Sequence, residues 1–393
     1  MANHVVMAGH SRSEDGVASL AYVPAIHVLD LASKQDMDAR DKRGHDGWKD
    51  GALGIRSKAG EIIMDAILRI TSLVLAASLG AVSSANAQNK VLLRFSTAAP
   101  PPDFLSKSVE RFKEEIEKAA PNQFEVRVHA GSSLFRQGTE VPAIQRGNLE
   151  MSTMTTFEVA QQIAEWGFFN RAFLFRDWDH AAKVMSGPIA ERYKKEVADK
   201  MGIMILGHTY LGTRQLNLRV KRDVKGPADL RGVKLRMAGG PEWLLLGESL
   251  GVTPTPMAMP EVYLALKTGS IDGQENPLTI MNAAKYYEVT EQVVLTAHLV
   301  QPVFYALRKE TWDALSADHK RVVQAAADAA TAQNTQARSA DEKQVAERLK
   351  TQGLTVTAVD AKPFHDHADR VYGASDFAKA WNKDLLAQTA ATR

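Results

Sequence analysis

The sequence predicts an α/β protein of two lobes with strands that cross between them. Between residues 90 and 206, apolar positions change repeatedly between strand-like and helical spacing, so strands and helices alternate along the chain. The same alternation returns with other lengths between residues 213 and 307. An Ala-rich segment of about 35 residues follows, and as a helix it would be roughly 50 Å long, enough to brace both lobes. This order of elements is typical of a mostly parallel sheet.

The elements of the first lobe follow from the spacing of apolar residues. Residues 90–96 form an apolar stretch that predicts a strand, and a proline turn separates it from a helix over 105–119. Phe124, Val126 and Val128 alternate with polar residues, which predicts a half-buried strand. Further on, we expect a helix over 141–149, a strand over 151–154, a helix over 180–200 and a buried strand over 203–206.

The second lobe shows similar signals. We expect a helical turn at 227–230, a strand over 233–237, a helix over 241–250, a helix over 260–268 and a strand over 303–307. Gly269 suits the end of the fourth of these elements, because glycine readily adopts the left-handed conformation that closes a helix. Ser316 is a suitable N-cap for the long helix, which is predicted to reach residue 350 and to end at Gly353.

Composition excludes several classes of protein. Hydrophobic residues make up 45% and charged residues 24% of the 393-residue chain, as in soluble globular proteins. The net charge of +2 is far too small to indicate a nucleic-acid partner. The chain contains no cysteine, which excludes disulfides and thiol chemistry. It also lacks the common nucleotide, metalloprotease and serine-hydrolase motifs, so we predict no cofactor. His365 and His367 would face different sides of a helix, and we predict no metal site there.

The N-terminal part has the features of an export signal. Residues 70–82 form an apolar run too short to cross a bilayer, and Ala85-Asn86-Ala87 matches the small-residue cleavage pattern. We therefore expect a signal peptide over 64–87, cleaved after Ala87, and export to the periplasm without a remaining membrane span. Residues 1–63 show no clear periodicity, and we predict that they are a disordered extension from a start codon assigned too early, with the true start near Met64.

A series of short motifs between residues 213 and 277 identifies a family. In chain order the motifs are Thr213-Arg214-Gln215, LRGVKLR at 230–236, GVTPTPM at 251–257, EVYLAL at 261–266 and DGQENP at 272–277. In this order and spacing the series closely resembles the solute-binding proteins of TRAP (tripartite ATP-independent periplasmic) transporters of the DctP type. The resemblance extends over residues 90–390.

The resemblance implies a fold and a function. The fold would be that of a two-lobed periplasmic binding protein with crossing hinge strands and a long bracing helix. Lobe I would contain residues 88–213 and about 302–341, and lobe II residues 214–301 and about 342–393. The protein would not be an enzyme. It would act as a monomer that captures a small organic acid and delivers it to the small and large membrane subunits of the transporter.

The resemblance also implies the binding residues. It gives Arg236 a two-pronged salt bridge to the ligand carboxylate, places Arg214 and Asn276 at the pocket, and puts Met259 at an apolar or aromatic pocket position. The residues themselves favour the first role. Arg236 ends a short strand just before a Gly-Gly-Pro turn, and ligands gather at the carboxyl ends of such strands. A guanidinium group presents a planar fork that matches a carboxylate and stays charged in a dry cleft.

Three further residues are candidates for the pocket. Gly239 would let the backbone approach the ligand closely. Thr155, followed by Thr156 and Phe157, suggests a polar and partly aromatic wall. Glu275 either lines the pocket beside Asn276 or pairs with a basic residue, such as an arginine.

Several ligands and roles remain open at this point. A C4-dicarboxylate or a related carboxylate would suit two arginines, with Arg214 binding the second carboxylate or supporting the first. A sugar acid, such as a uronate or an aldonate, is the alternative ligand. A periplasmic sensor or scavenger is an alternative role. An enzyme acting on a sugar acid would need an acid–base pair, which the sequence does not offer.

Overall fold

A single mixed sheet of nine strands organises residues 90–393, the part of the chain that the computed structural model describes. The predicted extension over 1–63 and the predicted signal peptide over 64–87 lie outside these residues. Within the described part, no helix has both the length and the apolar character needed to cross a membrane.

The two ends of the sheet are parallel. At one end, β1 (Val91–Ser96) lies between β2 (Phe124–His129) and β3 (Met151–Thr155) and is parallel to both. At the other end, β5 (Lys234–Met237) lies between β6 (Thr253–Pro256) and β7 (Gly273–Pro277), again with parallel pairing. The strand order runs from β2 at one edge to β6 at the other, so these two strands are the most widely separated in the sheet.

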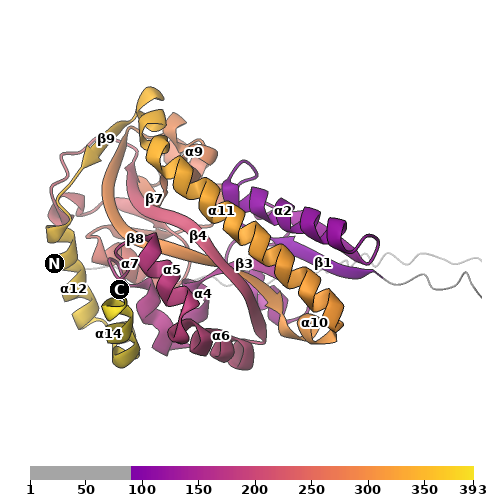
Figure 1. Ribbon diagram of the computed structural model, residues 1–393. Helices are drawn as coiled ribbons and strands as arrows, with labels where there is room; N and C mark the ends of the chain where they lie inside the picture. The colour runs from indigo at the N-terminus through magenta and orange to yellow at the C-terminus, as the bar shows by residue number, and fades with distance from the viewer. Residues whose placement is uncertain (1–89) are drawn as a thin grey trace, which may run out of the picture. The chain divides into compact units, whose positions relative to one another are not determined.

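Two long strands, β4 (Ile203–Leu218) and β8 (Gln292–Arg308), join these ends (Figure 1). They pair antiparallel with each other, while β8 also pairs antiparallel with β3 and β4 with β7. A short strand, β9 (Thr355–Ala358), runs parallel to β8. The predicted parallel pairing is therefore found at both ends of the sheet, while the long strands that cross its middle pair antiparallel. The strands expected at 203–206 and 303–307 are much longer than predicted.

The β4–β8 ladder is irregular, and for this reason the spacing of apolar residues does not predict the full length of the two strands. Its register shifts at three places, and two of them lie beside Gly207 and Gly212. Such bulges bend a strand and increase its twist. Gly212 has a φ of +128°, and a Cβ at this position would lie 2.4 Å from the Cβ of Pro277, so the site requires glycine. Glycines and polar residues inside a strand interrupt the apolar spacing from which strands are predicted.

The long helix is confirmed. Helix α11 (Ala317–Thr351) begins after Ser316, whose side chain accepts a hydrogen bond from the His319 N–H, and Gly353 follows its end with a φ of +98°. It lies across β4 beside α2 (Phe104–Ala119), as Figure 1 shows. Phe95, Phe112 and Tyr305 pack edge to face between α2, β1 and β8, with ring centroids 4.9 to 6.1 Å apart.

Two predicted helices have different bounds in the structure. The helix expected over 180–200 is divided into α5 (Trp178–Ser186) and α6 (Pro188–Met201), because Gly187-Pro188 interrupts the backbone hydrogen bonds of a continuous helix. The helix expected over 141–149 is the shorter α3 (Glu140–Gln145), and Gly147 follows it with a φ of +76°. The remaining short elements are α4 (Thr156–Ala160), η2 (Ala164–Asn170), η3 (Pro227–Leu230), α7 (Pro241–Ser249), η4 (Met259–Glu261), α8 (Val262–Thr268), α9 (Leu278–Ala283), η5 (Tyr286–Glu288) and α10 (Lys309–Ala314).

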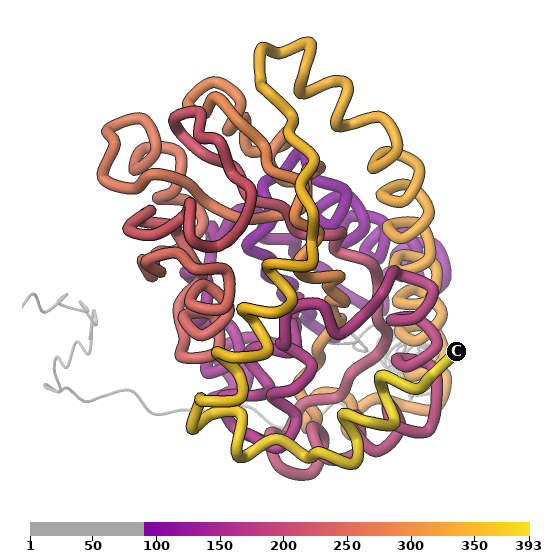
Figure 2. The backbone as a smooth tube through the Cα atoms, turned by 90° about the vertical axis from the view of Figure 1, so that its left-hand side faces the viewer, coloured from indigo at the N-terminus to yellow at the C-terminus, as the bar shows by residue number. Residues whose placement is uncertain are grey.

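The C-terminal segment returns across the molecule. Figure 2 shows this yellow segment descending from the end of α11 and turning back at the bottom of the view. It contains α12 (Lys362–Ala374), α13 (Asp376–Lys379) and α14 (Lys383–Ala391). Helix α12 packs on α7, and α13 packs on η2. The segment thus contacts helices that follow both the β3 and the β5 strands.

Candidate functional site

A pocket lies among the loops that follow the strands at both ends of the sheet. The empty space within it is about 780 Å³, open solvent at its mouth included. Of the seven predicted site residues, Glu275 is the one that does not line it. The six that do are Thr155, Arg214, Arg236, Gly239, Met259 and Asn276.

Arg236 is buried at the wall of this pocket without a carboxylate partner among the described residues. Its exposed fraction is 1%. Its Nε donates to the carbonyl oxygen of Met257 at 2.8 Å, and its Nη2 donates to Oε1 of Gln137 at 2.7 Å. Both acceptors are neutral, so the positive charge is not compensated by direct contact. Burial lowers the pKa of Arg236 to about 10, which still leaves the guanidinium charged at neutral pH.

The two contacts fix the orientation of the guanidinium plane. Nε and Nη2 form one edge of that plane, and both have protein acceptors on that edge. Nη1 has no hydrogen-bond acceptor among the described residues, so the end of the fork formed by Nη1 and Nη2 is available to a ligand. A carboxylate meeting this end would receive two parallel, charge-assisted hydrogen bonds.

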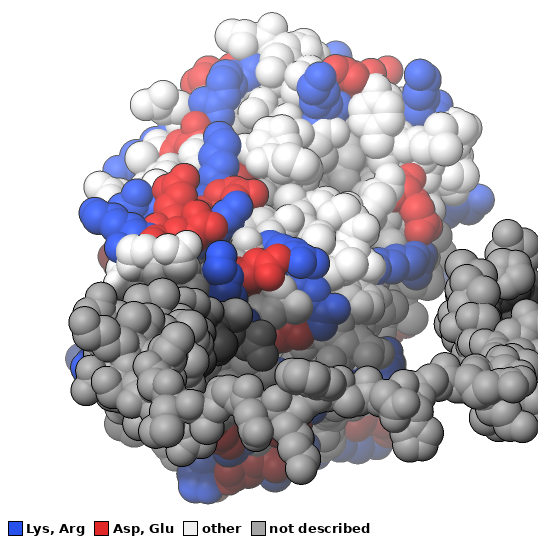
Figure 3. Space-filling view, turned by 90° about the vertical axis from the view of Figure 1, so that its right-hand side faces the viewer, with Lys and Arg blue, Asp and Glu red and all other residues white. Residues whose placement is uncertain are grey.

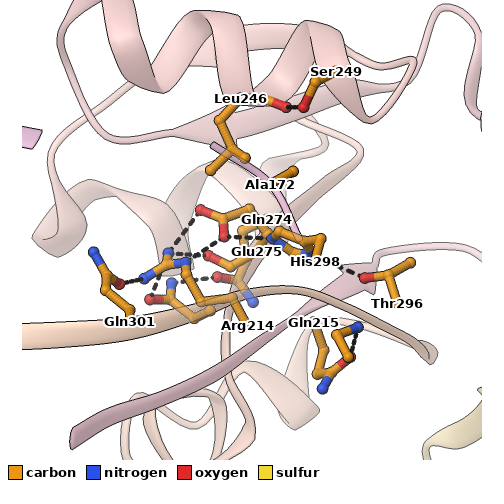
Figure 4. A network of polar contacts seen from close by, with 12 residues as sticks. Ala172, Arg214, Gln215, Leu246, Ser249, Gln274, Glu275, Thr296, His298 and Gln301 are labelled. Carbon is orange, nitrogen blue, oxygen red and sulfur yellow. Dashed lines mark hydrogen bonds and ion pairs between the residues drawn. The ribbon is translucent and has the colours of Figure 1, made fainter. Parts of the chain in front are cut away.

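Arg214 differs from Arg236 because a carboxylate already compensates it. Its Nη2 donates to Oε1 of Glu275 at 2.7 Å, and its Nε donates to the other carboxylate oxygen. Nη2 also donates to Oδ1 of Asn276 at 3.1 Å, and Nη1 donates to Oε1 of Gln301 at 2.7 Å. Figure 4 shows Arg214 between Gln301 and Glu275. Glu275 therefore takes the second of its two predicted roles, pairing with an arginine behind the pocket wall.

The buried carboxylate of Glu275 is stabilised from a second side. Burial by itself would raise the pKa of Glu275, but Arg214 and His298 outweigh it and hold that pKa below its ordinary value. The Nε2 of His298 lies 3.1 Å from Oε2 of Glu275, and its Nδ1 lies 2.8 Å from Oγ1 of Thr296. Burial lowers the pKa of His298, so the neutral imidazole donates to Glu275 and accepts from Thr296.

Two aromatic rings pack beside Arg214 at the pocket wall. The guanidinium of Arg214 lies over the ring of Trp243, 4.9 Å from its centroid. Trp243 also stacks on Phe157, with centroids 3.6 Å apart and planes inclined by 9°. Trp243 comes from α7 and Phe157 from α4, so this stack joins helices that follow β5 and β3.

The remaining predicted residues have specific positions. Asn276 accepts from Arg214 and donates through Nδ2 to Oε1 of Gln274 at 2.6 Å, so both ends of its amide are held. The Met259 side chain is 9% exposed at the pocket wall. A Cβ at Gly239 would meet no atom within 4 Å, so glycine at this position leaves space open in the pocket.

Carboxylates lie at another part of the pocket lining. Glu140 and Glu158 both line it. Burial raises the pKa of Glu140 to about 7 and also raises the pKa of Glu158, and the charge of Glu158 further raises that of Glu140. Thr155 holds Glu158 in place, because its N–H donates to Oε2 at 2.9 Å and its hydroxyl donates to the same oxygen. Thr155 is therefore engaged with the helix α4 that it caps.

Sequence reasoning missed four polar residues of the lining, namely Gln137, Glu140, Glu158 and Gln301. The sequence does carry a signal for Gln301, which is a lone amide inside an apolar strand segment. In the structure its buried Nε2 has no hydrogen-bond partner among residues 90–393. Glu158 completes a T-x-x-E capping box, which predicts a helix start rather than a pocket. Gln137 lies in a polar loop and has no distinguishing pattern.

The charged side chains in Figure 3 show no large area of one sign. On the part of this face that is not grey, Lys and Arg lie near Asp and Glu and are separated by areas of uncharged residues. Among residues 90–393, no group of three or more His, Asp or Glu side chains is arranged to hold a metal ion.

Comparisons with known proteins agree with the predicted family and with the fold. Residues 95–379 match the family model described as bacterial extracellular solute-binding protein, family 7 (DctP). A solute-binding protein of Verminephrobacter eiseniae is 31% identical over 275 residues, which is 70% of this chain and 81% of that relative.

Two solved structures extend the comparison. A TRAP periplasmic solute-binding protein of Roseobacter denitrificans, with bound 3-deoxy-D-manno-oct-2-ulosonic acid, is 39% identical, with a TM-score of 0.74 over 78% of this chain and all of that one. Another from a Polaromonas species, bound to D-erythronate, is 28% identical, with a TM-score of 0.72 over 77% of this chain and 99% of that one. The predicted two-lobed binding-protein fold with its long bracing helix is confirmed.

Proposed function

We propose that this chain, which belongs to family 7 of the bacterial extracellular solute-binding proteins, the DctP family of TRAP transporters, captures a polyhydroxylated monocarboxylate, that is, a sugar acid. The family consists of binding proteins rather than enzymes. The distribution of charge around the pocket favours this class of ligand.

The observation on which the proposal rests is the uncompensated guanidinium of Arg236. A buried charge without an opposite charge in contact is unfavourable, and a ligand carboxylate would remove that cost. Its free Nη1–Nη2 end gives the planar geometry that a carboxylate needs.

The rest of the pocket favours hydroxyl groups over a second carboxylate. Arg214 is neutralised by Glu275, so it offers little net attraction to another anion. Glu140 and Glu158 line the pocket as well and would repel a second carboxylate when ionised. Carboxylate oxygens accept hydrogen bonds from sugar hydroxyls, and the unpartnered Nε2 of Gln301 can donate to a hydroxyl oxygen. The two solved relatives from Roseobacter denitrificans and Polaromonas each hold a hydroxylated acid.

We further propose the wider role that membership of the family suggests. The protein would act in the periplasm, bind its ligand between a lobe of residues 88–213 and about 302–341 and a lobe of residues 214–301 and about 342–393, and deliver it to the small and large membrane subunits. Closing the cleft would remove water from around Arg236 and so strengthen its contact with the ligand.

A ligand panel tests the proposal. Thermal shift and calorimetry would compare 3-deoxy-D-manno-oct-2-ulosonate, D-erythronate and D-galactonate with succinate, and erythritol would serve as the matched control without a carboxylate. We expect at least one hydroxylated monocarboxylate to bind more tightly than succinate, and erythritol not to bind. Equal or tighter binding of succinate would instead indicate a dicarboxylate receptor.

A further inference from the structure

The two edges of the sheet meet at the loop after β2, where Arg136 pairs with Glu261 of η4 at 2.7 Å and Gln137 makes the more buried contacts. Gln137 belongs to the loop after β2, and Met259 lies in η4, just after β6. These strands are at opposite edges of the sheet, with six strands between them in the strand order. Nevertheless, Oε1 of Gln137 accepts a hydrogen bond from the Met259 N–H at 2.8 Å and another from Nη2 of Arg236 at 2.7 Å.

The chemistry of the partners fixes which end of the amide is involved. A backbone N–H and a guanidinium can only donate, so the oxygen of Gln137 must face both of them. Its Nε2 group then has no acceptor among the described residues and remains a donor at the pocket lining, where Gln137 lies.

The loop that presents Gln137 is held by local contacts. Gly131 and Gly138 have φ values of +66° and +89°. The hydroxyl of Thr139 donates to the carbonyl of Arg136 at 2.7 Å, and the Gly138 N–H donates to Glu140 at 2.8 Å. The backbone that carries Gln137 is therefore an ordered turn, which limits where its side-chain amide can lie.

We propose that Gln137 is a positioning residue that couples the orientation of Arg236 to the closing of the cleft. Its oxygen holds one edge of the guanidinium plane, so the other end of the fork faces the ligand. The same oxygen fastens the loop after β2 to η4, so the orienting contact forms only when the two edges of the sheet come together. The inference rests on the proposed role of Arg236 as the carboxylate-binding residue.

A glutamine suits this role better than a glutamate. A neutral amide oxygen orients the guanidinium and leaves its charge available to the ligand. A carboxylate at the same position would form an internal ion pair with Arg236 and would compete with the ligand. Gln137→Glu should therefore make the ligand-free protein more stable while it weakens ligand binding, and a merely structural residue would not produce these opposite effects.

The first experiment measures binding and melting temperature together, with 3-deoxy-D-manno-oct-2-ulosonate, D-erythronate and D-galactonate as probes. We expect Gln137→Ala to lower affinity roughly 10- to 100-fold, the range for a lost hydrogen bond to a charged group. Gln137→Glu should lose about 100-fold or more and melt at a higher temperature than the wild type. Arg127→Ala on β2 is the matched control. Its side chain is 57% exposed and its ion pair with Glu125 stays within β2, so affinity should stay within about 2-fold.

The outcomes separate this inference from the proposed function. If the wild type binds a probe and both Gln137 variants bind it equally well, the positioning role is wrong and the proposed function stands. If the wild type binds none of the acids, the proposed function fails, and the second experiment decides the closing role of Gln137 alone.

The second experiment needs no ligand. The chain contains no cysteine, so Glu110→Cys on α2 and Lys267→Cys on α8 would carry the only two spin labels. We expect Gln137→Ala to shift the distance distribution between the labels to longer values in the ligand-free protein. An unchanged distribution would overturn the coupling between Gln137 and cleft closing.

Discussion

Oε1 of Glu275 lies 2.7 Å from Nη2 of Arg214, and both side chains are almost completely buried. Glu275 neutralises Arg214, so one of the two arginine charges at the pocket is not available to a ligand. Two arginines in a binding motif are compatible with a dicarboxylate, but only Arg236 remains without a carboxylate partner among the described residues. The pair thus distinguishes an arginine that supports the wall from one that is available to a ligand.

Replacing Glu275 with Gln should destabilise the protein. The substitution leaves Arg214 charged and buried without its carboxylate, which costs about 3–5 kcal/mol in comparable cases. Urea unfolding would measure the change in the free energy of unfolding. Asp199→Asn is the control, because its ion pair with Lys195 is exposed and should contribute less than about 1 kcal/mol. Equal stability of the Glu275 variant and the wild type would contradict this account of the pair.

Removing the guanidinium of Arg236 should abolish tight binding. We expect Arg236→Ala to weaken carboxylate binding by about 3–5 kcal/mol, since the ligand would lose a buried, charge-assisted partner. Arg236→Lys should recover only part of this loss, because an ammonium group cannot form the planar double contact. Calorimetry with the tightest-binding acid of the panel checks both variants, and unchanged affinity in the alanine variant would remove the basis for the proposed function.

The stability of the protein should depend on pH through Glu140. Because burial raises its pKa to about 7, the folded protein retains a proton that the unfolded chain releases at lower pH. Stability therefore falls as the pH rises from about 4.5 to about 7 and stays lower above that range. Glu140→Gln removes this titration. Relative to the wild type, the free energy of unfolding of this variant should therefore increase by up to about 3 kcal/mol as the pH rises from 4 to 8.

Urea unfolding at several pH values tests this expectation. Glu114→Gln on α2 is the control, because its side chain is 65% exposed and its substitution should leave the profile unchanged. A Glu140 variant with the same pH profile as the wild type would show that this carboxyl group does not titrate in that range.

Gly212 should not tolerate a side chain. Its φ of +128° and the 2.4 Å that would separate an added Cβ from Pro277 combine backbone strain with a steric clash, so we expect Gly212→Ala to cost more than about 1 kcal/mol. Gly373→Ala, near the end of α12, is the matched control. A Cβ there meets no atom within 4 Å, and the variant should be neutral or slightly more stable. Equal melting temperatures of the two variants would contradict the role of Gly212 at the strand crossing.

The elements that the sequence predicts well are those whose signal is local. The caps of α11 at Ser316 and Gly353 and the strand that contains Arg236 depend on neighbouring residues, and the structure contains them. The full length of β4 could not be predicted, because its polar groups find partners far along the chain. Asn334 of α11, for example, donates to the carbonyl of Tyr210 at 2.7 Å.

The same distinction applies to the pocket. Arg236 was recognisable from its motif, but the partner that leaves its charge available, Gln137, is 99 residues away. Likewise, the pairing of Arg214 with Glu275 joins residues 61 positions apart, and their sequence does not reveal whether Glu275 faces a ligand or an arginine. Contacts of this kind depend on how the strands pair, which apolar spacing does not determine.

The position of β8 in the chain has a consequence for when the protein can fold. This strand pairs with β3, β4 and β9, yet it spans Gln292–Arg308, so the strands at either end of the sheet cannot be joined until roughly the last quarter of the chain is available. Pairings between such distant segments form slowly, because a long loop must close before any contact compensates for it. A nascent chain with this order of strands can pair β1 with β2 and β3, and β4 with β7, but it cannot complete the sheet before β8 has been synthesised.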